Sequence, residues 1–355
     1  MRCVCDAMIR AGGDPMIDAL HCLFQECWAA GHTPDRWSTA LVRMLHKRNS
    51  KHVVTNYRGI SLLDIMGKMF EKVCANRAMA MQVHLPTGVG IHPEQLGFNP
   101  GHSVDDALFG LLEGIKYNRN LGKYVIALSL DVKRAYPSMS RGRMLKCVRQ
   151  MGYSEQLLQA MSSTYVNNTS AVLGGEHGVQ SDQYSVRDGL REGAVLSPML
   201  YNIFVASLLT DLKSELYRQD GMHVGDIWAG AQMWADDIVI TAADSDFEKA
   251  KAKMKRLMGA ANTWAAANGV QFSTDETEGP GAGKSKVLTF GKSAITQTKW
   301  PLGREVQQIQ YLGATISRKL TWTDHVADRI AASGPKLHGV RQLARNNEQY
   351  RHRGV

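Results

Sequence analysis

The sequence lacks a long apolar run, so no stretch approaches the roughly 20 residues that a bilayer-spanning helix needs. The opening residues, Met1-Arg2-Cys3-Val4-Cys5-Asp6, lack the apolar core and cleavage pattern of a signal peptide. We therefore expect an intracellular protein of the cytoplasm or the nucleus, with no membrane partner. This beginning is more typical of an excerpt from a longer open reading frame.

The sequence also lacks the patterns of a zinc site and of a phosphate-binding P-loop. The six cysteines form no CxxC pair and no pairing with metal-spaced histidines, which favours reduced thiols over a zinc site. A phosphate-binding P-loop ending at Gly283-Lys284-Ser285 would need glycine at position 278, where Glu278 stands, and no apolar strand precedes it. The chain also has no internal repeats or heptads.

The composition is that of a globular protein with a polyanionic partner. At 355 residues and 44% apolar content, the chain is long enough for two or three sub-domains. Its formal charge of +9 favours a partner such as nucleic acid, although many basic proteins bind none.

Two adjacent carboxylates, Asp236-Asp237, lie between apolar segments that predict the arms of a tight hairpin, 231–235 and 238–242. Adjacent aspartates repel each other, and an apolar hairpin solvates them poorly, so a cation must compensate them or one must stay protonated. Mg²⁺ held by oxygen ligands beside substrate phosphates is the commonest arrangement of this kind. The alternative is a solvated turn, because turns favour aspartate.

A third carboxylate ends a near-continuous apolar strand predicted over 124–131. A buried strand with Asp131 at its end is how a rigid scaffold places a catalytic acid. A second acidic pair, Asp105-Asp106, falls in the first turn of a predicted helix over 104–117 that Ser103 caps. The helix dipole favours carboxylates there, so this pair is interpreted as structural.

Several basic residues have two interpretations. Lys47 and Arg58 could bind a triphosphate, or they could be solvated surface charges. Arg58 lies in a predicted turn that leads into a helix ending near Met81. The predicted helix 141–151 carries a basic face that could follow a phosphate backbone or simply face solvent. That face consists of Arg141, Arg143, Lys146 and Arg149. Further along, Ser197 is predicted to cap a helix with Pro198 at its first position.

Blocks spread over most of the chain, from about Trp37 to Ala331, occur in one order. They are Trp37 with Lys47, Asn56-Tyr57-Arg58-Gly59-Ile60-Ser61, Gln95-Leu96-Gly97-Phe98, Leu130-Asp131-Val132-Lys133-Arg134-Ala135-Tyr136, Gly193 with Leu196-Ser197-Pro198, Trp234-Ala235-Asp236-Asp237, Lys284-Ser285-Lys286, and Tyr311-Leu312-Gly313 with Trp322 and His325. In this order the chain resembles the reverse transcriptase domain of non-LTR (LINE-type) retrotransposons.

The resemblance implies an α+β right-hand polymerase with fingers, an antiparallel-sheet palm packed on helices, and a partial thumb. It divides the chain into an N-terminal helical extension (1–36), fingers (37–120), palm (121–315) and the start of a truncated thumb (316–355). Asp131, Asp236 and Asp237, with the backbone carbonyl of Val132, would hold two Mg²⁺ ions, or Mn²⁺ in their place.

The same resemblance gives roles to other residues. Lys47 and Arg58 would clamp the triphosphate, and Tyr136 would lie under the sugar as a steric gate against a 2′-hydroxyl. Gly193 would let the backbone approach the nucleotide. Lys284, or else Lys286, would protonate the leaving pyrophosphate, and Tyr311-Leu312-Gly313 would grip the primer end.

Three positions depart from the family pattern. Glu192 stands where glutamine is usual, beside the bound nucleotide, and should repel the triphosphate unless it is protonated or paired, for example with Arg191. Trp234 replaces the usual tyrosine or phenylalanine, and Pro137 stands where many relatives have aspartate. None removes a catalytic carboxylate.

The expected function is RNA-directed DNA synthesis from dNTPs on an RNA template and a DNA primer. Flanking endonuclease or nucleic-acid-binding domains would lie outside this sequence. Two alternatives stay open: a group II intron-type reverse transcriptase, and a decayed copy that only binds nucleic acid.

Overall fold

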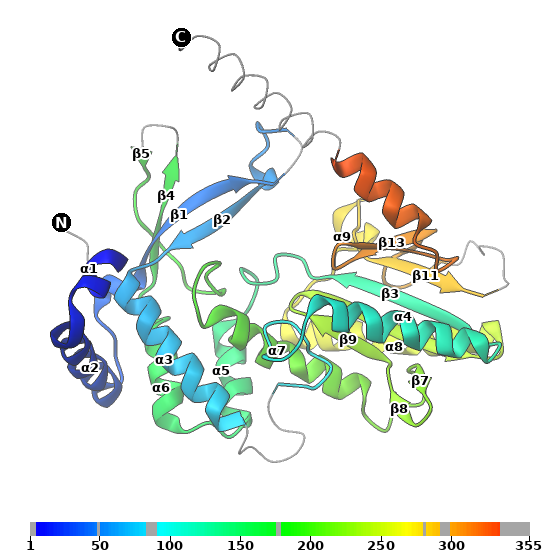
Figure 1. Cartoon of the computed structure of the whole chain (residues 1–355), viewed down its shortest axis with the longest axis horizontal. Helices are drawn as coiled ribbons and strands as arrows, with labels where there is room; N and C mark the ends of the chain where they lie inside the picture. Colours follow the sequence, from blue (N-terminus) through cyan, green and yellow to red (C-terminus); the bar gives the residue numbers. More distant parts are fainter. Residues whose placement is uncertain are drawn as a thin grey trace, which may run out of the picture. The chain divides into compact units, whose positions relative to one another are not determined.

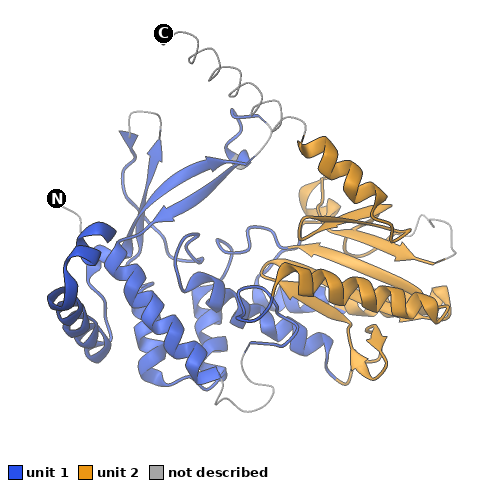
Figure 2. Cartoon of the chain, viewed as in Figure 1, with its two compact units in different colours: residues 1–102, 132–214, 260–272 blue, residues 103–131, 215–259, 273–355 orange. Residues whose placement is uncertain are grey.

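The computed structural model describes residues 5–47, 50–82, 91–174, 179–279, 282–291 and 299–333. Within these residues, no helix has the length and apolar character required to cross a membrane. The chain divides into two compact units (Figure 2). The first comprises residues 1–102, 132–214 and 260–272, and the second comprises 103–131, 215–259 and 273–355.

The sheet of the first unit is built around β1 (Thr39–His46). It pairs antiparallel with β2 (Tyr57–Leu62) and parallel with β4 (Thr169–Gly174), which in turn pairs with two short strands, β5 (Val179–Gln180) and β6 (Tyr184–Ser185). The prediction of a turn running from Asn56 straight into a helix was wrong. Residues 57–62 form β2 because β1 offers them a register partner at every position.

Helices make up the rest of the first unit (Figure 1). They are α1 (Asp6–Ala11), α2 (Gly13–Ala30), α3 (Ile65–Gln82), α5 (Arg141–Gln150), α6 (Glu155–Ser163) and α7 (Ser197–Leu212), with 3₁₀ turns at Asp35–Ser38 and Val54–Asn56. The sequence predicts a first helix that Asp14 caps and Gly31 closes. Its end is confirmed in α2, where Gly31 has the left-handed φ of 67°, but its predicted start is wrong, because α2 already begins at Gly13 with Gly12 as N-cap residue.

Helix α7 is buried on all sides. The prediction that Ser197 caps it was wrong: Leu196 is the N-cap residue, and the Ser197 hydroxyl donates to the Arg191 carbonyl at 2.8 Å. The Glu71 carboxylate instead accepts the backbone N–H groups of Val195 and Leu196, at 2.6 and 3.2 Å.

The second unit contains a five-stranded sheet in the order β12-β11-β3-β10-β9 (Figure 1). Its strands are β3 (Tyr124–Asp131), β9 (Ala231–Trp234), β10 (Asp237–Asp244), β11 (Lys286–Phe290) and β12 (Arg304–Glu305). Two short hairpins accompany it: β7 (His223–Val224) with β8 (Ile227–Trp228), and β13 (Gln308–Tyr311) with β14 (Ala314–Ser317).

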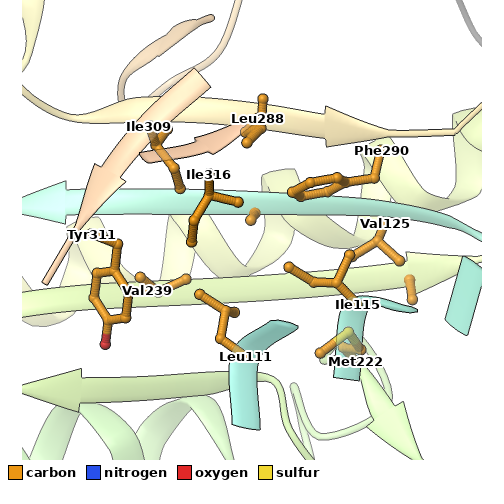
Figure 3. Close-up of a cluster of buried hydrophobic side chains, with 12 residues drawn as sticks. Leu111, Ile115, Val125, Met222, Val239, Leu288, Phe290, Ile309, Tyr311 and Ile316 are labelled. Carbon is orange, nitrogen blue, oxygen red and sulfur yellow. The ribbon is translucent and has the colours of Figure 1, made fainter. Parts of the chain in front are cut away.

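Strand β3 lies in the middle of this sheet and has the predicted bounds. On one face, Val125 and Ala127 join a buried cluster with residues of α4 (Val104–Asn120), β10, β11 and the β13–β14 hairpin (Figure 3). On the other face, Ile126 and Leu128 are also fully buried. Both faces are covered, which explains why the strand reads as a continuous apolar run.

Helix α4 begins with the predicted cap. The Ser103 hydroxyl accepts the Asp106 N–H at 3.2 Å, and the Asp106 carboxylate accepts the Ser103 N–H at 2.7 Å. This reciprocal pair is a capping box, so the structural interpretation of Asp106 is confirmed. The remaining elements are α8 (Phe247–Asn268), α9 (Asp275–Glu278) and a helix over residues 323–333.

Candidate functional site

The first candidate group lies in the second unit, where β3 and β10 run antiparallel. Their register pairs Asp131 directly with Asp237 at one end and Tyr124 with Asp244 at the other. Residues directly opposite in such a ladder have Cα atoms about 4.5–5.5 Å apart. The sheet therefore brings two carboxylates that are distant in sequence to one edge.

The third carboxylate comes from the β9–β10 hairpin. Its two arms end at Trp234 and begin again at Asp237, so the loop consists of Ala235 and Asp236. The predicted hairpin is confirmed, but its boundary is shifted: Asp237 is a strand residue and only Asp236 lies in the turn. Ala235 has a φ of 56°. A positive φ at the first of two loop residues is the pattern of a type II′ turn, which favours glycine, and alanine there costs roughly 1–3 kcal/mol.

The three carboxylates disturb one another electrostatically. Partial burial, with the negative charges of Asp236 and Asp131, raises the pKa of Asp237 to about 6. A cation already approaches this group, because the Lys284 ammonium lies 3.3 Å from the Asp131 carboxylate. Lys286, the second lysine considered, lies on β11 opposite Ser129. Of the two, Lys284 is therefore the one in contact with the acidic group.

The donor chemistry of this group fits a hard divalent cation. The side chains supply only carboxylate oxygens. Burial, and after it the repulsion from Asp236 and Asp131, raises the pKa of Asp237, and a bound cation would offset both effects. Among the residues that the structure describes, no three His, Cys, Asp or Glu side chains are close enough to surround one ion. The fit therefore rests on charge and donor type rather than on a preformed cage.

Two serines that were not predicted from the sequence bind the Asp131 backbone. The Ser285 hydroxyl accepts the Asp131 N–H at 3.2 Å, and the Ser273 N–H donates to the Asp131 carbonyl at 2.8 Å. Both serines are buried. The available signal was the alternation Lys284-Ser285-Lys286, which places Ser285 on the face opposite the lysines.

The predicted turn at Leu312-Gly313 is present. It joins β13 to β14, and both residues have positive φ, 49° and 81°, as in a type I′ hairpin. Tyr311, just before the turn, is buried, and its hydroxyl lies 3.2 Å from the Gln232 amide nitrogen on β9. Burial raises the pKa of Tyr311, and the Asp237 charge adds to this effect.

The second candidate group lies in the first unit. Arg58, on β2, forms an ion pair with Glu192: its Nε is 3.2 Å from the carboxylate. The prediction that Arg191 could pair with Glu192 was wrong. Arg191 and Glu71 are buried and lie 2.9 Å apart, so the Arg191 guanidinium turns into the interior. Lys47 is exposed just beyond the end of β1, where its N–H donates to the Asn56 carbonyl at 2.8 Å.

Gly193 is a position that only glycine fits. Its φ is +116°, and a Cβ atom there would lie 2.6 Å from the Ser61 carbonyl oxygen. The preceding peptide is fastened to β2, since the Ser61 N–H donates to the Glu192 carbonyl at 2.7 Å. Gly193 therefore lets this loop lie flat against the strand that carries Arg58.

Val132 and Tyr136 follow Asp131 in the chain and belong to the first unit. The Val132 side chain is buried, and Val132 forms an isolated bridge with Phe272. The Tyr136 ring is half-buried and packs edge-on against Tyr201 of α7, with ring centroids 5.3 Å apart.

The structure contradicts the basic-face hypothesis for α5 at one of its four residues, Arg141. Arg141 is buried, and its guanidinium donates to the carbonyls of Gly189, Tyr165 and Val186 at 2.9–3.0 Å. It is therefore a structural residue and cannot follow a phosphate backbone. On the same helix, Arg149 forms an exposed ion pair with Glu155 at 3.0 Å.

Glu71 was not predicted from the sequence, yet it contacts both Arg191 and the start of α7. Besides pairing with Arg191, its carboxylate holds the start of α7, and it is only 2% exposed. The available signal was its helical spacing with Cys74, Ala75 and Ala78, which puts a carboxylate on the buried face of α3.

Carboxylates at a sheet edge and basic side chains are the residue types that metal-dependent phosphoryl transfer uses, and comparison with known proteins gives the family. The reverse transcriptase (RNA-dependent DNA polymerase) family matches residues 45–316, which is more than half of the chain. The chain belongs to this family.

Relatives come from mobile elements. The RNA-directed DNA polymerase from mobile element jockey of Drosophila melanogaster is 23% identical over 325 residues, which are 90% of this chain and 33% of the relative. A putative 115 kDa protein in the type-1 retrotransposable element R1DM of the same species is 25% identical over 331 residues, 91% of this chain and 29% of the relative. The chain thus spans about a third of the length of these relatives.

Solved structures show the fold. Apo telomerase from Candida tropicalis, truncated from its C-terminal domain, matches with a TM-score of 0.52 at 11% identity, over 81% of this chain and 55% of the telomerase chain. A second structure of apo telomerase from the same organism matches with a TM-score of 0.51 at 12% identity, over 87% of this chain and 53% of the telomerase chain. The expected right-hand polymerase fold is confirmed.

Proposed function

We propose that this chain is the catalytic part of an RNA-directed DNA polymerase that copies a non-LTR retrotransposon. It would extend a primer 3′-hydroxyl with dNTPs on an RNA template. One observation carries the proposal: the register of β3 and β10 pairs Asp131 with Asp237, and the adjoining turn adds Asp236.

These three carboxylates, with the Val132 carbonyl, would hold two Mg²⁺ ions. When bound, the ions would lower the pKa of the primer hydroxyl and neutralise charge on the triphosphate and the departing pyrophosphate. The protein's part is to fix the ligands on a rigid sheet, with Ser285 and Ser273 holding the Asp131 backbone. The pairing of β9 with β10 on both sides of the turn would hold Ala235 at its unfavourable positive φ and so fix the backbone beside Asp236.

Other residues would bind and select the nucleotide. Lys47 and Arg58 would contact the triphosphate, because ammonium and guanidinium groups suit phosphate oxygens. Tyr136, held against Tyr201, would exclude a 2′-hydroxyl. Gly193 would give the backbone room beside the nucleotide, and Lys284 would deliver a proton to the leaving pyrophosphate.

The domain assignment is also part of the proposal. Fingers would occupy residues 37–120, the palm 121–315 and the start of a thumb 316–355, with 1–36 as an N-terminal extension. Since the chain matches only 29–33% of its retrotransposon relatives, endonuclease or further nucleic-acid-binding domains would flank it in the whole protein.

Primer extension tests the proposal. The chain is incubated with an RNA template, a labelled DNA primer, dNTPs and Mg²⁺, beside its Asp236→Ala variant. Asp226→Ala is the matched control, because Asp226 is likewise the second residue of a two-residue hairpin loop, between β7 and β8. The parent and Asp226→Ala should extend the primer, and Asp236→Ala should not. Bound template–primer without extension by the parent would indicate a nucleic-acid binder instead.

A further inference from the structure

Arg58 and Glu192 form an ion pair at a position where the proposed function needs the arginine for a different anion. The Arg58 Nε lies 3.2 Å from the Glu192 carboxylate. A guanidinium makes the same charge-assisted hydrogen bonds to a carboxylate and to a phosphate. The Glu192 carboxylate therefore binds the Arg58 guanidinium in the way that a triphosphate oxygen would.

The main chain holds these two residues side by side independently of the ion pair. The Ser61 N–H donates to the Glu192 carbonyl at 2.7 Å, and Gly193 packs against the Ser61 carbonyl. Because the loop stays attached to β2 through these backbone contacts, the two side chains can separate without moving the loop.

Arg58, and not the adjacent Arg191, forms the ion pair with Glu192. Arg191, the adjacent residue, is engaged with Glu71 in the interior, 2.9 Å away. The side chain of Arg58 is 54% exposed and that of Glu192 is 25% exposed, so a ligand from solution can reach both. An exposed pair of this kind exchanges partners readily, since water competes with it at all times.

We propose that Glu192 sets the affinity for the incoming nucleotide. Its carboxylate holds Arg58 in the nucleotide-free protein, and the triphosphate must displace it before Arg58 can bind a phosphate oxygen. This inference rests on the proposed function of Arg58. It makes Glu192 an affinity-determining residue rather than a catalytic one.

The size of the effect follows from the exposure of the pair. Exposed ion pairs change an equilibrium constant by a factor of about 1.4–5. Removing the glutamate charge also removes its repulsion of the triphosphate. We therefore expect Glu192→Gln to lower the KM for dNTPs by about two- to fivefold with kcat unchanged. The gain should shrink as ionic strength rises, because salt screens exposed charges.

The experiment measures KM and kcat for dNTPs in primer extension at low and high salt. Glu155→Gln is the matched control, since Glu155 forms an exposed pair with Arg149 in the same unit, and it should leave KM unchanged. Glu192→Gln should lower KM in the parent and lower it less in the Arg58→Gln background, where only the direct repulsion of the triphosphate is removed. An unchanged or raised KM, or an equal gain without Arg58, would overturn the proposal.

A second measurement separates this inference from the proposed function. Calorimetric titration with inorganic tripolyphosphate requires no catalysis. Tighter binding by Glu192→Gln than by the parent and Glu155→Gln supports displacement at Arg58, even if no variant extends a primer. Equal binding by all three overturns the inference, even if the parent is an active polymerase.

Discussion

Asp237→Asn should stabilise this protein while abolishing the activity proposed for it. The side chain of Asp237 lies opposite Asp131 and next to Asp236, and the amide removes one of three mutually repelling charges at almost constant shape. Carboxylates that are placed close together to bind a metal ion repel one another when the ion is absent, so they lower the stability of the metal-free protein. Neutralising one of them should therefore raise the melting temperature, Tm, in the absence of divalent ions.

The magnitude follows from the pKa of Asp237, which rises from 3.8 to about 6. One pKa unit corresponds to about 1.36 kcal/mol, so the penalty on the ionised form has a ceiling of about 3 kcal/mol. This penalty combines partial burial with the repulsion from Asp236 and Asp131, and because much of the residue's surface remains exposed, water reduces it. An effect of about 1–2 kcal/mol remains, which corresponds to a Tm rise of about 2–8 °C.

The pH dependence has a defined sign. The pKa of Asp237 is raised by folding, so the folded state gains stability as the carboxyl takes up a proton below about pH 6. The advantage of Asp237→Asn over the parent should thus be full at pH 8, about half as large at pH 5, and nearly absent by pH 4.

Thermal unfolding in EDTA at these three pH values is the assay. Asp244→Asn, on the same strand, is a control for which the expected change in Tm has the opposite sign. Although burial opposes ionisation of Asp244, a hydrogen bond from the Asp246 N–H and the Lys253 ammonium, 3.0 Å away, lower its pKa. Asp244→Asn should therefore lower Tm at pH 8. Mg²⁺ should raise the Tm of the parent more than that of Asp237→Asn.

One result would refute this reasoning. If Asp237→Asn leaves Tm unchanged or lowers it at pH 8 in EDTA, while Asp244→Asn destabilises as expected, the carboxylates do not repel one another in the folded protein. The acidic edge of the sheet would then be an ordinary solvated turn, and its use as a metal site would lose its physical support.

Two further predictions concern the first unit. Tyr136→Val should let the enzyme incorporate ribonucleotides, because it removes the ring proposed to exclude the 2′-hydroxyl. In primer extension, the ratio of the KM for rNTPs to the KM for dNTPs should fall at least tenfold. An unchanged ratio would show that Tyr136 only packs against Tyr201. Glu71→Ala should lower the free energy of unfolding by about 3–5 kcal/mol, measured by urea denaturation, because it leaves the buried Arg191 unpaired; a loss below about 1 kcal/mol would contradict this.

Local signals in the sequence determined a large part of the fold. The apolar run of β3 with its terminal Asp131, the Ser103 cap of α4 and the end of α2 at Gly31 are all confirmed. Each depends on residues a few positions apart, so short-range chemistry is sufficient to specify it.

The prediction was weaker wherever a distant partner decides the structure. Residues 57–62 looked like a turn because their strand needs β1 to pair with. The hairpin boundary moved because the pairing of Trp234 with Asp237, rather than composition, fixes which two residues form the loop. Arg141 looked solvated, but three carbonyls from other segments surround it.

The sequence by itself determined which residue types this protein brings to its candidate site: carboxylates on a strand and a hairpin, and basic residues. The structure showed that position 193 accepts only glycine. Only the tertiary structure decided how the charges pair. Glu192 meets Arg58 rather than Arg191, Glu71 neutralises Arg191, and Lys284 reaches Asp131. The reason is physical: ion pairs between segments far apart in the chain depend on strand register and burial, which no local pattern of residues encodes.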